Sequence, residues 1–132
     1  MSKRTLIAAL AGGALLFAGA QALAAASAYH VIDRIAGPDG GWDYVRVDGK
    51  TDQVLVTRGS AVMAVGVADG KVNPAFAQGT RMHIAMPVAD GSEVVLTNGG
   101  SDTAVFIDAA TGATLATAPT GKGPDASAYD AA

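Results

Sequence analysis

The sequence contains no cysteine among its 132 residues. Disulfide bonds, zinc sites built on thiolates, thiol nucleophiles and a lipid anchor on an N-terminal cysteine are therefore excluded. The folded chain must be held together by side-chain packing and backbone hydrogen bonds alone.

Basic residues are few and isolated. Lys and Arg number 9 against 12 Asp and Glu, which gives a net charge of −3 at pH 7. Without the two basic residues of the first four positions, Lys3 and Arg4, the net charge is −5. Because binding to a phosphate backbone needs clustered basic side chains, nucleic acid is not expected as a partner.

Long hydrophobic runs are confined to the N-terminus. The basic pair Lys3-Arg4 precedes an apolar run over residues 5–20, and residues 22–24 and 26–28 offer small-residue cleavage sites. This layout predicts a signal peptide over residues 1–28 and a periplasmic or secreted mature chain with no stable membrane span. The alternative is an uncleaved membrane anchor over residues 5–28.

The rest of the sequence repeats itself about every forty residues. Asp43, His83 and Asp125 hold equivalent places in three successive copies, forty and then forty-two residues apart. Thr57 and Thr97 each end a matching β-branched run and are each followed, after one residue, by Gly. A repeat period of this length predicts a repeat architecture.

Each full copy contains four short runs of strand-like composition and no convincing helix. In the second copy they lie at residues 83–88, 93–97, 103–108 and 113–118, between turns that contain Gly. Four strands per forty residues, a WD40-like period, predict an all-β chain of antiparallel β-propeller blades in an incomplete ring. The alternative is a pair of β-hairpins in an ordinary sandwich. The expected blades cover about residues 42–77 and 82–118, with the start of a third at about 124–132.

Several phrases of the sequence resemble those of YVTN-type β-propeller repeat proteins, within the seven-bladed lactonase-like superfamily. Residues 56–59 (VTRG) and 96–99 (LTNG) are similar to the Tyr-Val-Thr-Asn phrase of that family. Residues 107–112 (IDAATG) are similar to its V-x-D-x-x-T-G strand and turn, and residues 121–126 (GKGPDA) to the phrase that opens a blade. The first copy departs from the family pattern, because residues 68–70 (ADG) replace the longer turn.

The resemblance implies a ring of usually seven blades, in which residues 29–35 form an outer strand of the last blade. Since the matching pattern stops inside a third copy, we expect the chain to be the N-terminal part of a propeller. A truncated gene, a fragment of a longer gene, and a piece that assembles with others all remain open.

In a closed ring, Asp43, His83 and Asp125 would gather around one mouth of the channel. Carboxylate oxygens and a neutral imidazole nitrogen can hold a divalent cation or a polar ligand, so the three residues are candidate ligand-binding residues, with metal use unknown. The alternative is that each caps its own turn. For His30, the sequence shows no second residue with which it would form a site.

Motifs for other chemistry are missing or incomplete. The sequence contains no G-x-S-x-G elbow, so no catalytic residue is assigned. Residues 48–52 (DGKTD) match a calcium loop too poorly and are expected to form a turn. Trp42 is expected to pack against a neighbouring blade, and the alternative is that it stacks on a ligand or a base.

Together these features predict a binding or scaffolding module whose partner is an unidentified protein or small molecule. No cofactor is identified. The alternative, which the resemblance implies, is a lactonase-like hydrolase with a polar or metal site at the channel mouth.

Overall fold

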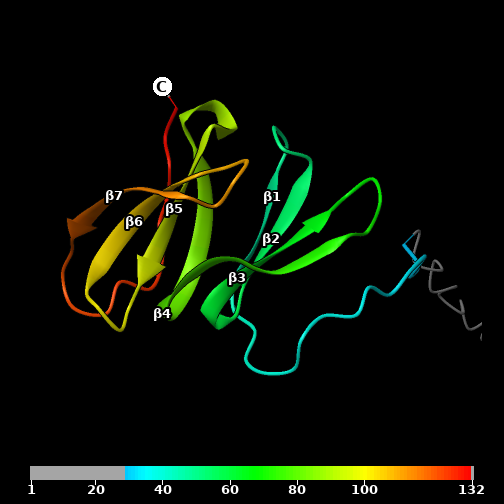
Figure 1. Ribbon diagram of the computed structural model, residues 1–132, viewed down its shortest axis with the longest axis horizontal. Helices are drawn as coiled ribbons and strands as arrows, with labels where there is room; N and C mark the ends of the chain where they lie inside the picture. Colours follow the sequence, from blue (N-terminus) through cyan, green and yellow to red (C-terminus); the bar gives the residue numbers. More distant parts are fainter. Residues whose placement is uncertain (1–28, 132) are drawn as a thin grey trace, which may run out of the picture. The chain divides into compact units, whose positions relative to one another are not determined.

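Strands make up almost all of the regular structure in the computed structural model, which describes residues 29–131. Each strand is hydrogen-bonded to the next one along the chain, so the seven form one open antiparallel sheet (Figure 1). No α-helix occurs among the described residues, and the prediction of an all-β chain is confirmed. The strands are β1 (Val45–Asp48), β2 (Gln53–Thr57), β3 (Gly59–Gly66), β4 (Val72–Val88), β5 (Glu93–Asn98), β6 (Thr103–Asp108) and β7 (Thr114–Pro119), with a short 3-10 turn η1 (Ala89–Gly91) between β4 and β5.

The longest strand, β4, belongs to both halves of the sheet. Its residues 72–78 pair mainly with β3 and its residues 82–88 with β5. Arg81, between the two stretches, has a φ of 46°, and both ladders shift register nearby. Figure 1 shows β1–β3 on one side of β4 and β5–β7 on the other. Two strands that the repeat predicts as separate, the last of the first copy and the first of the second, are therefore one continuous strand.

We call β1–β3 with residues 72–78 the first half of the sheet, and residues 82–88 with β5–β7 the second half. The second half agrees closely with the strand positions predicted from the repeat. The runs at residues 93–97, 103–108 and 113–118 correspond to β5, β6 and β7, with ends that differ by at most one residue.

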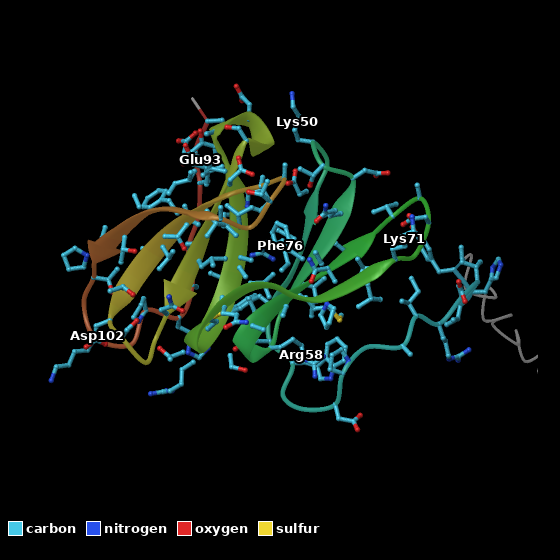
Figure 2. The ribbon with its side chains drawn as sticks, viewed as in Figure 1. Lys50, Arg58, Lys71, Phe76, Glu93 and Asp102 are labelled. Carbon is cyan, nitrogen blue, oxygen red and sulfur yellow. The ribbon has the colours of Figure 1, made fainter. Side chains whose placement is uncertain are left out.

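The main hydrophobic core contains residues from both halves. Alternating residues of a strand point to opposite faces, and accordingly β3 contributes Val62 and Ala64 to this core and β5 contributes Val94 and Leu96. Leu55 and Val62 enter it from the first half and Leu96 and Ile107 from the second, and Phe76 lies near the middle of the view in Figure 2. The core consists of Leu55, Val62, Ala64, Phe76, Ala77, Met82, Ala85, Val94, Leu96, Ile107 and Ala109.

Two segments expected to be strands are not. Residues 29–35, expected as an outer strand of a last blade, have no strand assignment, and neither do residues 124–131. A strand persists only where a neighbouring strand pairs with its backbone groups. No strand among residues 29–131 pairs with either segment, which explains their irregular backbone.

The predicted signal peptide, residues 1–28, lies outside the described residues. Within residues 29–131, no helix has the length and apolar character needed to cross a membrane. Whether the chain is cleaved or anchored therefore stays a prediction from the sequence.

Packing between the two halves can be tested with a matched pair of leucines. Leu96 is fully buried in the core, whereas Leu115 on β7 is 54% exposed. We expect Leu96→Ala to lower the free energy of unfolding by about 2–5 kcal/mol, because the substitution leaves a cavity. Leu115→Ala should lower it by less than about 0.5 kcal/mol. Urea unfolding followed by circular dichroism gives both values, and equal losses would contradict the assignment of the core.

Candidate functional site

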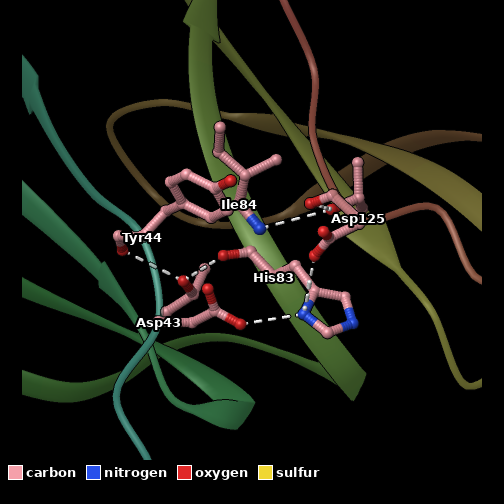
Figure 3. Close-up of polar contacts among 7 residues, drawn as sticks. Asp43, Tyr44, His83, Ile84 and Asp125 are labelled. Atoms are coloured by element: carbon pink, nitrogen blue, oxygen red, sulfur yellow. Dashed lines mark hydrogen bonds and ion pairs between the residues drawn. The ribbon is translucent and has the colours of Figure 1, made fainter.

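The structure brings Asp43, His83 and Asp125 together (Figure 3). Asp43 precedes β1, His83 lies within β4, and Asp125 follows β7. The Nδ1 atom of His83 lies 2.8 Å from Oδ2 of Asp43 and 3.2 Å from Oδ1 of Asp125. One ligand atom from each of the three residues falls within 4.8 Å of the others. Whether the group binds a ligand stays a prediction.

Backbone hydrogen bonds place Asp43 beside β4. The Asp43 N–H donates to the carbonyl of Thr57 at 3.0 Å, and the Thr57 N–H donates to the carbonyl of Tyr44 at 3.1 Å. The Tyr44 N–H in turn donates to the carbonyl of His83 at 3.3 Å. The segment before β1 is thereby held between the end of β2 and the middle of β4.

Two threonine hydroxyls make equivalent contacts one repeat apart. The Thr57 hydroxyl lies within donating reach of the carbonyls of Tyr44 and His83. The Thr97 hydroxyl accepts from the Ile84 N–H at 3.2 Å and donates to the Asp125 carbonyl at 3.3 Å. Each hydroxyl therefore ties the segment of its own copy to the equivalent segment of the next.

The repeat in the sequence includes these two threonines but does not predict their contacts. Thr57 and Thr97 recur at the ends of matching runs, but nothing in the sequence showed which backbone groups they contact. Both are buried, so their hydroxyls need partners inside the protein. The recurrence of a threonine at the end of a β-branched run was the sequence signal that could have identified them as positioning residues.

Gly99 sets the distance of the chain from the His83 ring. A Cβ atom at position 99 would lie 2.9 Å from Nε2 of His83 and 3.1 Å from the Arg81 carbonyl. Glycine is therefore the residue that lets β4 and the turn after β5 approach this closely. The His83 side chain is 22% exposed, against 36% for Asp43 and 70% for Asp125, so the group is open to solvent on the Asp125 side.

The arrangement can do two kinds of chemistry. A carboxylate on Nδ1 orients an imidazole so that the other ring nitrogen can accept a proton. Two carboxylates and one imidazole nitrogen can also surround a cation. His30 is not among the three residues of this group.

The carboxylates of two other aspartates accept hydrogen bonds from residues in the turns that follow them. The Asp48 carboxylate accepts from the Lys50 N–H at 2.9 Å and from the Thr51 hydroxyl at 2.7 Å, which agrees with the predicted turn over residues 48–52. Asp108 makes a similar arrangement in the turn between β6 and β7 with Thr111, whose hydroxyl and N–H donate to it at 2.7 and 2.8 Å. These bonds, that of the Thr111 hydroxyl first, lower the pKa of Asp108 from its ordinary value of 3.8.

Trp42 does not pack as expected. Its side chain is 57% exposed, and the Arg58 guanidinium lies 3.9 Å from the centre of its ring. Arg58 also donates from Nε to the Gly41 carbonyl at 2.8 Å. The prediction that a neighbouring blade covers Trp42 is not met within the described residues, where the cation stacks on the ring instead.

A separate hollow of about 440 Å³ lies where the β3–β4 hairpin meets the β6–β7 turn. Gln53, Phe76 and Thr111 line it, and Asp69 and Lys71 form an ion pair of 2.8 Å at its edge. The hydrogen bond between these two side chains raises the pKa of Lys71 and lowers that of Asp69. No member of the Asp43–His83–Asp125 group lines this hollow.

Comparison with known proteins adds no family assignment. No protein-family model matches the chain, and no curated protein has a matching sequence. The resemblance to YVTN-type repeats therefore stays a prediction.

The Thr97 hydroxyl gives a direct test of how the group is positioned. We expect Thr97→Val to cost about 1–3 kcal/mol of unfolding free energy, because it leaves the Ile84 N–H without its acceptor. Amide exchange should speed up at Ile84 and near Asp125. Thr97→Ser, which keeps the hydroxyl, is the matched control and should retain most of the protection. Equal protection in the valine and serine variants would rule out a tie through the hydroxyl.

The Asp108 turn gives a test by pH. A lowered pKa stabilises the folded state above pH 3.8, and this contribution is lost as the pH falls below 3.8 through the folded-state value. Thr111→Val removes the main donor, so the Asp108 pKa should rise toward 3.8 and the acid-induced loss of stability should shrink. Carboxyl-carbon NMR titration measures the pKa, with Thr114→Val as control. An unchanged Asp108 titration in Thr111→Val would contradict the stated cause.

Proposed function

We propose that this chain is an exported binding module built from YVTN-type β-propeller repeats, with Asp43, His83 and Asp125 as its binding site. The observation that carries the proposal is the convergence of equivalent positions from three successive copies on one imidazole nitrogen. Side chains that merely cap their own turns would have no reason to meet. The group carries two carboxylates and is open to solvent, so the ligand class it fits best is a positively charged one.

The repeat supports reading the two halves of the sheet as successive blades. Each half contains four strand segments in antiparallel order, and their apolar faces meet in one core. Thr57 and Thr97 tie each copy to the next by the same kind of contact. Tyr129, at the start of the third copy, lines a small hollow with Val95 and Phe106 of the second half, which supports the proposal that a further blade follows here.

A lactonase-like hydrolase is the second candidate, and one contact favours it. The 2.8 Å contact between His83 Nδ1 and Asp43 Oδ2 is the geometry of an oriented general base, which could activate water against a lactone carbonyl. A binding module needs no such step. The two functions therefore differ in whether the ligand is turned over.

Three small probes separate these functions in the full chain, kept free of metal with a chelator. Glucosamine offers a cationic amine, glucose is its neutral counterpart, and glucono-1,5-lactone is a hydrolase substrate. We expect glucosamine to shift the amide resonances of Asp43, His83 and Asp125 saturably, at least about tenfold more tightly than glucose, because the two carboxylates attract the amine. Asp43→Asn should weaken this binding, whereas Asp39→Asn should leave it unchanged.

The outcomes divide the candidates clearly. Lactone hydrolysis faster than in buffer, and lost in His83→Gln, would replace the binding module with the hydrolase. Equal shifts with glucosamine and glucose, or shifts confined to residues outside the group, would reject a cation-binding role for these residues.

A further inference from the structure

The contacts of His83 Nδ1 are more than one hydrogen bond can explain. Asp43 Oδ2 and Asp125 Oδ1 lie 2.8 and 3.2 Å from this single atom. An imidazole nitrogen carries at most one proton, and that proton can point well at only one oxygen. The two carboxylates also repel each other. One proton on Nδ1 therefore offsets only part of the electrostatic cost of holding them together.

A metal ion among the three atoms would satisfy all of them. Metal–nitrogen and metal–oxygen bonds of about 2.0–2.2 Å place neighbouring ligand atoms roughly 2.8–3.6 Å apart in octahedral or tetrahedral sites. The 3.2 Å separation falls within this range and the 2.8 Å separation lies at its lower limit. Asp125, with its side chain 70% exposed, can turn toward an ion at little cost.

The backbone around the group already holds its members in place. The Thr57 hydroxyl contacts the His83 carbonyl, and the Thr97 hydroxyl donates to the Asp125 carbonyl. Gly99 sits against the other edge of the His83 ring. A site held by supporting contacts binds an ion without first paying to order its ligands.

The donor set selects the class of ion. We propose that Asp43, His83 and Asp125 bind a divalent first-row transition-metal ion of the Zn²⁺ type. Two carboxylates balance the charge of a divalent ion, and the imidazole nitrogen favours a transition metal over Ca²⁺ or Mg²⁺, which prefer oxygen ligands only. Three protein ligands leave at least one coordination position open to water or to a polar ligand. This inference rests on the proposed function only in using the same three residues.

Titration of the full chain with Zn²⁺ after chelator treatment and dialysis tests the inference. Isothermal titration calorimetry should give one Zn²⁺ per chain, bound at least about tenfold more tightly than Ca²⁺ or Mg²⁺. Asp125→Asn and His83→Gln should each weaken binding about tenfold or more, as loss of a ligand requires. His30→Gln, which changes the other histidine of the chain, is the matched control and should bind as tightly as the parent. Substitution with Co²⁺ should give visible absorption bands that His83→Gln alters.

Circular dichroism of each variant separates loss of metal from loss of fold, and Asp125→Asn is the variant whose exposed side chain is least able to disturb folding. Three results would overturn the metal site: no saturable Zn²⁺ binding by the folded chain, Zn²⁺ binding unchanged in His83→Gln and Asp125→Asn, or Ca²⁺ binding as tight as that of Zn²⁺. Failure of this inference is distinguishable from failure of the proposed function, because glucosamine binding is measured with the chelator present. A negative result for Zn²⁺ binding therefore does not reject glucosamine binding, and a negative result for glucosamine does not reject the metal site.

Discussion

The rest of the structure depends on the double pairing of β4. Its first part completes the ladder with β3 and its second part begins the ladder with β5, so one strand carries the hydrogen bonds of both halves. Arg81 and the register shifts beside it mark the place where one ladder gives way to the other. Because the halves share a strand, their apolar faces are brought together and buried in a common core.

His83 lies next to this transition, which explains why the polar group forms there. The backbone around His83 is not fully used by the ladders, and its carbonyl accepts from the Tyr44 N–H. Hydroxyls of Thr57 and Thr97 then link this part of the sheet to the segments before β1 and after β7. Polar side chains from three copies therefore meet where hydroxyls and carbonyls from adjacent segments bond to one another.

Much of the second half was predictable from the sequence, and the ends of the chain were not. The positions of β5, β6 and β7 follow from alternation and from turns at glycine, which are local properties. Residues 29–35 and 124–131, expected as strands from the resemblance, have no strand hydrogen-bonded to them in the described sheet. The resemblance supplied the expected strands but not a hydrogen-bonding neighbour for them, so it overestimated the regular structure there.

By itself the sequence determined the all-β class, the period of the repeat and the equivalence of Asp43, His83 and Asp125. Alternation of apolar residues, turn residues and spacing are properties of the sequence that do not depend on tertiary contacts. The tertiary structure alone decided that two expected strands merge into β4, that Arg58 stacks on Trp42, and that Thr57 and Thr97 tie the copies together. It also decided that both carboxylates reach one imidazole nitrogen. These features depend on contacts between residues up to about forty positions apart, and such contacts arise only when the apolar faces of the sheet pack.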